Sequence, residues 1–351
     1  MYQKNIKESN EKKILNYIYQ NSKELSIADT AKVLGLTFPT VKSIFNKFLE
    51  KEILVEDMKI GKSTGRKAQS YSLKIDSNYG VGIKISKESL EIILVNEKGS
   101  ILRDVLIKDK DVGKNILNIV SSELRNFLSR MDEKDRKKIL GVGVSIPGVV
   151  DEKKSILEIS GKLWFDLEEF KSIFTDLNLK VIVDNEGNLS ALSEKFLGMG
   201  RDFSEYIVLN INETITMSSF FEQEKYGDFH FKAARVEHMS LDLNGKFCEC
   251  GNRGCWNLYS NINEISEKNM EDYLKYLSVG IKNIIFLYNP EKIIITGKIT
   301  KYEKLIKTRL IDEVYKENIF FRDRETILFS ELKDTGGVIG AGLIPIIDDI
   351  L

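Results

Sequence analysis

All three cysteines of the 351-residue chain lie in one eight-residue stretch, CECGNRGC. Thiolates are preferred zinc ligands, and a tetrahedral site needs a fourth ligand beside Cys248, Cys250 and Cys255. The chain has two histidines, His230 and His238, and either can supply that ligand. Two glycines inside the stretch allow the loop to fold back so that the sulfurs converge. The alternative is a loop of reduced cysteines without a metal. A redox role has less support from the sequence than either.

The cellular compartment and the type of partner follow from composition. An odd number of clustered cysteines does not fit a secreted disulfide framework. The chain opens on the polar MYQKNIKESNEKK and has no apolar run near 18 residues, so we expect a cytoplasmic protein without a membrane span. Residues 1–70 carry 13 Lys and Arg against 8 Asp and Glu, whereas the remainder carries 39 against 45. This asymmetry predicts a small N-terminal module with an anionic partner.

Residues 26–51 read as two helices joined by a tight turn. Ser26 is placed to cap the first helix and Gly35 to end it, while Thr37 caps the second helix with Pro39 in its first turn. One side of the second helix is an apolar stripe of Val41, Ile44, Phe45, Phe48 and Leu49. Its opposite side carries short polar and basic groups that suit phosphates and base edges: Thr40, Lys42, Ser43, Asn46 and Lys47.

Two strand-like runs, ILVEDMKI and QSYSLKI, follow and flank the basic, glycine-containing loop GKSTGRK. Residues 1–75 therefore predict a winged helix-turn-helix, with a helix for the major groove and a wing for the backbone or minor groove. The alternative is a helical protein-docking module with a solvated charged hairpin. The expected DNA contacts are Thr37, Pro39, Thr40, Lys42, Ser43, Asn46 and Lys47 from the helix, and Lys62, Arg66 and Lys67 from the wing.

Residues 76–351 alternate strand-like and helical stretches, which predicts an α/β body with a mixed sheet. The run from 79 to 102 reads as a β-hairpin that turns at Glu97-Lys98-Gly99. The segment KVIVDNEGNLSALSEKFLG reads as a strand, a polar corner and a helix. Two such strand sets predict two lobes with a cleft, in which the polar corners at strand ends face a ligand.

Several segments together resemble the ROK family, which includes bacterial repressors of sugar genes and sugar kinases on an actin-like, ribonuclease-H-like fold. They are the winged helix, VGVSIPGVVD, VIVDNEGNLSALSE, EHMSLDLNGKFCECGNRGCWNLYS and NPEKIIITGK. The resemblance implies a ROK domain over 76–351, with lobe one near 76–186 plus 337–351 and lobe two near 187–336. It also implies one structural zinc per chain, held by His238, Cys248, Cys250 and Cys255.

The phosphate-binding motifs of the family's kinases are degraded in this chain. Where the family has D-x-G-G-T, Lys84 replaces the acidic residue and Ser86-Lys87-Glu88 replaces the glycine turn. A tight glycine turn holds phosphate through backbone N–H groups. The glycine-rich second loop corresponds to NETITMSS, which has no glycine, and a later Gly-Gly corresponds to Gly297-Lys298. These departures predict a protein that does not use ATP and is not an enzyme.

The sugar-binding motifs are altered as well. The family's N-D-x-N corner reads NEGN here, so the carboxylate of a vestigial Glu186 is moved by about 1.5 Å, one carbon–carbon bond. A sugar-holding glutamate of the family corresponds to Arg235, whose planar fork suits a carboxylate or phosphate. An acidic sugar or sugar phosphate is therefore a candidate effector; alternatively Arg235 pairs with an acid such as Glu237 and no small molecule binds. The expected ligand contacts are Asn185, Glu186, Asn188, Arg235, His238 and Asn257.

The sequence thus predicts a transcriptional regulator, a repressor of carbohydrate-related genes. It would bind a double-stranded DNA operator as a homodimer or dimer of dimers and carry an effector between the lobes. One rival is a sugar kinase with a DNA-binding arm. The other is a DNA-binding dimer that responds to no ligand and uses its zinc-braced body as a scaffold.

Overall fold

The N-terminal module is a three-helix unit with a small two-stranded sheet. The computed structural model describes residues 2–21, 25–57, 69–86, 88–108, 115–151, 153–159, 163–175, 177–223, 228–316 and 324–350. The loop that carries Lys62, Arg66 and Lys67 lies outside these residues. The elements of the module are α1 (Tyr2–Gln20), α2 (Ile27–Leu34), α3 (Phe38–Glu50), β1 (Leu54–Glu56) and β2 (Tyr71–Leu73).

The capping residues position α2 and α3 as the sequence predicts. The Ser26 hydroxyl accepts the N–H of Asp29 at the start of α2, and Gly35 ends that helix in the left-handed conformation, φ 63°. The Thr37 hydroxyl accepts the N–H of Thr40 at the start of α3. Because a side chain at Gly35 would strain this backbone, the glycine sets the sharp corner between the two helices.

Two five-stranded mixed sheets follow the module in the chain. Both have the same arrangement, an antiparallel three-stranded meander joined to two parallel strands. The turn predicted at Glu97-Lys98-Gly99 joins the second and third strands of the first meander, and the run before that turn forms two strands instead of one. The first sheet has the order β10-β6-β3-β4-β5: β3 (Tyr79–Ile85), β4 (Ser89–Asn96), β5 (Ile101–Lys108), β6 (Ile139–Ile146) and β10 (Lys180–Asn185). The second has the order β13-β12-β11-β14-β15: β11 (Glu205–Ile211), β12 (Ile215–Gln223), β13 (Asp228–Ala234), β14 (Lys292–Thr296) and β15 (Ile327–Phe329).

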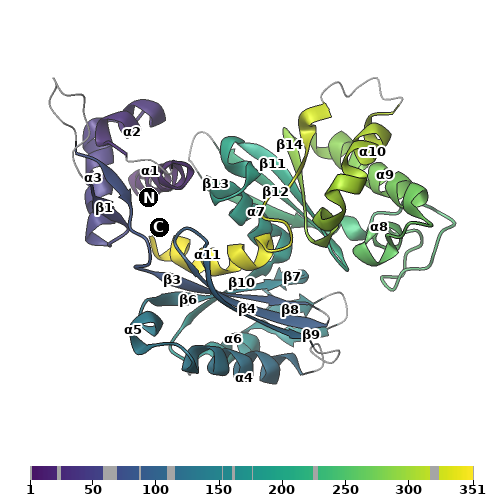
Figure 1. Cartoon of the computed structure of the whole chain (residues 1–351), viewed down its shortest axis with the longest axis horizontal. Coiled ribbons are helices and arrows are strands. Elements are labelled where there is room, and N and C mark those ends of the chain that lie inside the picture. The colour runs from purple at the N-terminus through teal and green to yellow at the C-terminus, as the bar shows by residue number, and fades with distance from the viewer. Residues whose placement is uncertain are drawn as a thin grey trace.

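Helices cover both faces of each sheet, and two of them, α7 (Glu186–Phe196) and α11 (Gly336–Ile350), pack on each other between the sheets (Figure 1). Helix α11 lies on the first sheet and α7 on the second. The outer helices are α4 (Ile116–Ser129), α5 (Glu133–Arg136), α6 (Leu167–Thr175), α9 (Met270–Tyr288) and α10 (Glu303–Tyr315). The remaining elements are the short sheet β7 (Gly148–Asp151), β8 (Ile156–Ile159) and β9 (Leu163–Asp166), helix α8 (Asn257–Ser260), and single turns η1 (Met199–Asp202), η2 (Val236–His238), η3 (Ile262–Glu264), η4 (Lys298–Tyr302) and η5 (Arg324–Thr326).

Glycines in β3 and β6 let α11 approach the first sheet closely. A Cβ added at Gly80 would lie 1.8 Å from the carbonyl oxygen of Gly342, and one at Gly143 would lie 1.9 Å from that of Ala341. Neither distance is compatible with a side chain. The alternating glycines of YGVGIKI and ILGVGVSI are therefore required on the α11 side, while the intervening Val and Ile residues fill the core on the other side.

The N-terminal module packs directly on the two central helices. One continuous apolar cluster includes buried side chains of α1 and α3 together with buried side chains of α7 and α11. The Tyr19 ring meets the Phe196 ring edge-on, with centroids 5.1 Å apart, and Lys51 donates to the carbonyl of Asp349 at 2.5 Å. Helix α7 thus extends from a polar corner at Glu186 to the module at Phe196. Among the described residues, no helix combines the length and apolar character needed to cross a membrane.

Candidate functional site

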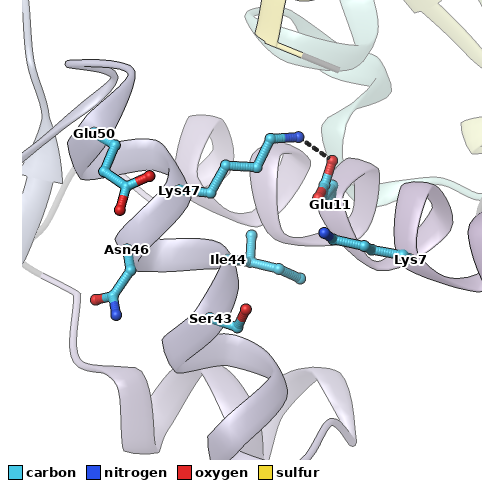
Figure 2. Close-up of a pocket in the computed structure, with 7 residues that line it drawn as sticks. All are labelled: Lys7, Glu11, Ser43, Ile44, Asn46, Lys47 and Glu50. Carbon is cyan, nitrogen blue, oxygen red and sulfur yellow. Dashed lines mark hydrogen bonds and ion pairs between the residues drawn. The ribbon is translucent and has the colours of Figure 1, made fainter.

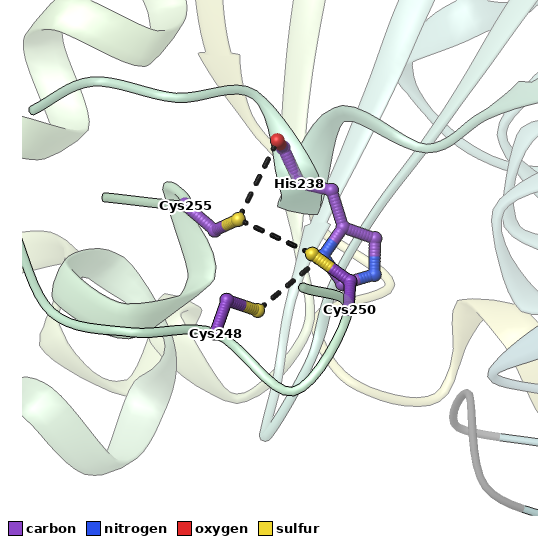
Figure 3. Close-up of side chains that lie close together, drawn as sticks. All are labelled: His238, Cys248, Cys250 and Cys255. Carbon is purple, nitrogen blue, oxygen red and sulfur yellow. Dashed lines mark hydrogen bonds between the residues drawn. The ribbon is translucent and has the colours of Figure 1, made fainter. Parts of the chain in front are cut away.

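The four predicted metal ligands converge, although His238 is ten residues before the first cysteine (Figure 3). The ligand atoms of His238, Cys248, Cys250 and Cys255 all lie within 4.8 Å of one another. The Sγ atoms of Cys250 and Cys255 are 3.6 Å apart, as are Cys248 Sγ and His238 Nδ1. Zinc–sulfur bonds of 2.3 Å in a tetrahedron place sulfurs about 3.8 Å apart. The donor set and its spacing therefore fit a closed metal site.

Local backbone geometry brings the cysteines together. Gly251 and Gly254 both have positive φ, 95° and 67°, and a Cβ at Gly254 would lie 1.7 Å from the carbonyl oxygen of Asp242. Cys248 and Cys255 are buried, whereas Cys250 is exposed. Positive φ favours glycine at both positions, and at Gly254 the nearby carbonyl also leaves no room for a side chain.

The imidazole of His238 is oriented by its neighbours. Its Nδ1 faces the cysteines, while Nε2 lies 3.7 Å from a carboxylate oxygen of Glu237. Burial lowers the pKa of His238, and the nearby Arg235 lowers it further, which favours the neutral imidazole that binds metals. Burial raises the pKa of Glu237 to about 7. His230 lies on β13, and the cysteines gather around His238 instead.

At the corner where β10 ends and α7 begins, the chain forms a buried ion pair. Lys84 Nζ lies 2.5 Å from Glu186 Oε1, and both side chains are largely buried. Asn212 donates to the same carboxylate oxygen at 3.0 Å. Burial alone would lower the pKa of Lys84, but the Glu186 carboxylate raises it above its ordinary value. Lys84 and Glu186, both singled out from the sequence, thus contact each other.

A second ion pair lies on the other side of Asn212. Lys298, at the start of η4, pairs with Glu213, and its backbone N–H donates to Asn212 Oδ1 at 2.8 Å. Burial would raise the pKa of Glu213, and the Lys298 ammonium lowers it below its usual value. Asn212 therefore connects Lys298 to Glu186.

The other predicted ligand contacts are also engaged within the chain. Asn185 caps α7 by accepting the N–H of Gly187 at 2.7 Å, and Asn257 accepts the N–H of Ile215 at 2.9 Å. Asn188 donates to Asp184 at 2.9 Å and accepts the hydroxyl of Ser218 at 2.7 Å. The hydrogen bonds of Asn185 and Asn188 hold the first turn of α7, and that of Asn257 joins α8 to β12.

Arg235 pairs with an acid, but the acid is not the one suggested by sequence. Its Nη2 lies 2.5 Å from Glu158 Oε1 on β8, whereas Glu237 was the example named for the alternative in which Arg235 pairs with an acid. Glu158 is buried, while 45% of the Arg235 side chain is exposed. The ion pair connects the short sheet β7-β8-β9 to the segment that precedes the metal ligands. Glu158 is 77 residues away in sequence, and no local pattern marks it.

The predicted DNA-binding side of α3 is available at its N-terminal half. Lys42, Ser43 and Asn46 are exposed and Thr40 is half-buried, while Val41, Ile44 and Phe48 are buried as predicted. Thr37 and Pro39 are exposed at the start of the helix. Lys47 is instead engaged with Glu11 of α1, 2.5 Å away. The first residue of α3, Phe38, is 50% exposed although its side chain is apolar.

Comparison with known proteins agrees with this architecture. A model of winged helix-turn-helix DNA-binding domains matches residues 7–55, and the ROK family model matches residues 80–263 and 257–346. The xylose repressor of Bacillus spizizenii is 25% identical over 339 residues, which cover 88% of this chain and 87% of the repressor. A glucokinase of Thermotoga maritima is 21% identical over 317 residues, covering 75% of this chain and 96% of the kinase.

Solved structures show the same fold. A crystal structure of a ROK family transcriptional regulator, a homologue of the E. coli Mlc protein, superposes with a TM-score of 0.73 at 19% identity and covers 97% of this chain and 96% of that one. A ROK family glucokinase from Streptomyces griseus, in complex with glucose and AMPPNP, gives 0.62 at 17% identity and covers 75% and 98%. The regulator structure therefore covers more of this chain than the kinase structure does. The protein therefore belongs to the ROK family and carries a winged helix-turn-helix ahead of its actin-like ROK domain.

Proposed function

We propose that the protein is a sugar-responsive transcriptional repressor that binds operator DNA through its winged helix. The observation that carries this proposal is the capped helix α3, whose exposed side presents Lys42, Ser43 and Asn46 on a module built into the body. Full-length similarity to proteins named xylose repressor supports the same function. We take 1–75 as the DNA-binding domain and 76–351 as the ROK domain, with lobes at about 76–186 plus 337–351 and 187–336.

The DNA contacts can be tested by salt titration of binding to a selected DNA site. Lys42→Ala removes a cation from the exposed side of α3, and Lys62→Ala removes one from the wing. Each should lower the salt slope by about one unit if the lysine contacts a phosphate. Arg66→Ala should weaken binding most when the site is flanked by A/T tracts, whose narrow minor groove attracts arginine. Wild-type binding by both Lys42→Ala and Arg66→Ala would instead indicate a protein-docking module.

A sugar kinase reaction is not expected. A sugar kinase needs a carboxylate free to accept the proton of a sugar hydroxyl, whereas Glu186 is paired with Lys84 and accepts from Asn212. Glu213 and Lys298 form an ion pair in the region that corresponds to the second phosphate loop. Incubation with Mg-ATP and a panel of pentoses, hexoses and N-acetylhexosamines should therefore give no ADP above background. ADP formation that is abolished by Glu186→Ala would show instead that the protein is a sugar kinase.

The effector is proposed to bind between the lobes, near Asn185, Glu186, Asn188, Arg235, His238 and Asn257. The Arg235 side chain is 45% exposed, which makes a sugar acid or sugar phosphate the first charged ligand to test, while the relatives' name makes xylose the first neutral sugar to test. Helix α7 starts at this corner and ends against Tyr19, which gives a direct structural connection to the DNA-binding domain. An effector acts through this connection only if it favours one arrangement of the lobes.

A ligand-independent repressor is the second candidate, and one observation favours it. The polar side chains at the corner already have partners within the chain: Glu186 pairs with Lys84, Arg235 with Glu158, and Asn257 with the N–H of Ile215. A site preorganised for a sugar usually presents polar groups that a ligand can satisfy. A thermal-shift screen with sugars, sugar acids and sugar phosphates separates the two candidates, because a bound ligand raises the melting temperature.

We further propose that the His238–Cys248–Cys250–Cys255 cluster holds one structural zinc ion. Three thiolates and one imidazole form a closed set of four ligands, with no position left for a reactive water. A homodimer in the cytoplasm completes the proposal, since helix-turn-helix repressors read paired half-sites. Light scattering on the purified protein tests the assembly, and a monomeric mass at micromolar concentration would contradict it.

A further inference from the structure

A buried carboxylate lies beside the recognition helix α3. Glu11 of α1 is 2% exposed, and its Oε2 lies 2.5 Å from Nζ of Lys47, whose side chain is 30% exposed. The pair borders a hollow of about 390 Å³ between α1 and α3 (Figure 2). Ser43 and Asn46, both on the exposed side of α3, line the same hollow. The ion pair is therefore adjacent to the proposed DNA contacts.

By its spacing, Lys47 belongs with those contacts. It follows Thr40 by seven residues and Ser43 by four, so the three side chains lie along one side of the helix. A free lysine at this place would add one phosphate contact to the interface. Its ammonium instead points toward α1, where the Glu11 carboxylate neutralises it (Figure 2).

The burial of Glu11 stabilises its ion pair with Lys47. An exposed ion pair is weak and screened, and its lysine exchanges readily for another anion. A buried carboxylate that loses its cation is left uncompensated, which is strongly unfavourable. A DNA phosphate near α3 would therefore have to separate Lys47 from an acid that is 2% exposed and has Lys7, one turn away on α1, as the other cation lining the hollow. We therefore expect Lys47 to remain with Glu11 when the other side chains of α3 meet DNA.

We propose that Glu11 is a positioning residue that withholds Lys47 from the DNA backbone and thereby lowers the sequence-independent part of DNA binding. The inference rests on the proposed DNA binding of the winged helix. Phosphate contacts contribute on any sequence, so the effect is visible on a duplex without an operator. Such a duplex is sufficient for the test, which needs no knowledge of the operator.

The test compares Glu11→Gln, the double variant Glu11→Gln/Lys47→Gln and the wild type on a duplex of random sequence over a range of salt concentrations. Glu11→Gln frees the ammonium, so binding should tighten about fivefold at 0.15 M salt and the salt slope should steepen by about 0.9. The double variant should return to wild-type values. Glu50→Gln, an exposed carboxylate on the same hollow, is the matched control and should leave the slope unchanged.

Three outcomes overturn the inference: a wild-type slope for Glu11→Gln, retention of the gain in the double variant, or the same steepening with Glu50→Gln. A wild type that binds no DNA at any salt concentration contradicts the proposed function instead. Circular dichroism checks that Glu11→Gln is folded.

A second, independent test uses the wild-type protein and asks whether Lys47 contacts DNA. In lysine acetylation followed by mass spectrometry, saturating DNA should protect the exposed Lys42 severalfold and leave the acetylation rate of Lys47 within about twofold of its value without DNA. Protection of Lys47 equal to that of Lys42 would show that the lysine reaches DNA, and the inference would be wrong.

Discussion

Replacing Cys250 by alanine should strip the metal from the protein and unfold the lobe around it at a much lower temperature. Structural zinc supplies binding free energy on the order of 10 kcal/mol in small domains, and that energy is coupled to folding. In a larger lobe we expect the loss of the metal to lower the free energy of unfolding by several kcal/mol. Because 1 kcal/mol shifts Tm by roughly 2–4 °C at this domain size, the melting temperature should fall by about 10 °C or more.

The measurement combines elemental analysis with thermal unfolding. Wild-type protein should contain about one equivalent of zinc, and a strong chelator should reproduce the lower melting temperature of Cys250→Ala. His230→Ala is the control: it removes the other histidine, on β13, and should keep both zinc and stability. A metal-free wild-type protein that melts at an unchanged temperature would exclude a structural metal.

Replacing Lys84 by methionine should destabilise the protein by about 3 kcal/mol, because the substitution leaves the buried Glu186 carboxylate without its cation. Adding Glu186→Gln to Lys84→Met should recover most of the loss, since a buried pair replaced as a whole is often neutral in its effect. Lys275→Met, which breaks an exposed pair with Asp272, should cost less than about 1 kcal/mol. Denaturant unfolding of these variants measures the differences in free energy.

The ion pair also gives a pH dependence with a definite sign. The pKa of Lys84 is raised in the folded protein, so its contribution to stability is complete below the unfolded lysine value of about 10.4 and is lost as pH rises through the folded value. Lys84→Met should therefore flatten the alkaline limb of the stability curve. Equal stability losses in Lys84→Met and Lys275→Met would show that the pair is not buried in solution.

Local patterns allowed much of the fold to be predicted from sequence. Ser26, Gly35 and Thr37 lie at the helix ends they were expected to form, because capping depends on residues only a few positions apart. The convergence of His238 with the cysteines was expected only through the family resemblance, and the structure confirms the clustering of the four side chains. The family and the winged helix were likewise identified correctly.

The rest depended on contacts between distant segments. Glu158 and Arg235 meet across 77 residues, and Glu11 and Lys47 across 36. Lys84 and Glu186 were both noted as departures from the kinase motifs, yet their pairing became visible only in the structure. A signal was present: a cation replaces an acid at one position while the other position keeps its carboxylate. The wing residues Lys62, Arg66 and Lys67 remain predictions outside the described residues.

The central claim, that this ROK protein is a DNA-binding repressor controlled by a sugar, is tested most directly by ligand-dependent release from DNA. A fluorescent duplex, selected by the protein from a random library, is bound and then titrated with xylose, other sugars, sugar acids and sugar phosphates. We predict specific binding and, with one class of ligand, a fall in affinity of about tenfold, which corresponds to a coupling free energy of about 1.4 kcal/mol. Failure to select any DNA sequence would contradict DNA binding. Unchanged affinity with every ligand would contradict control by a sugar and leave the ligand-independent repressor.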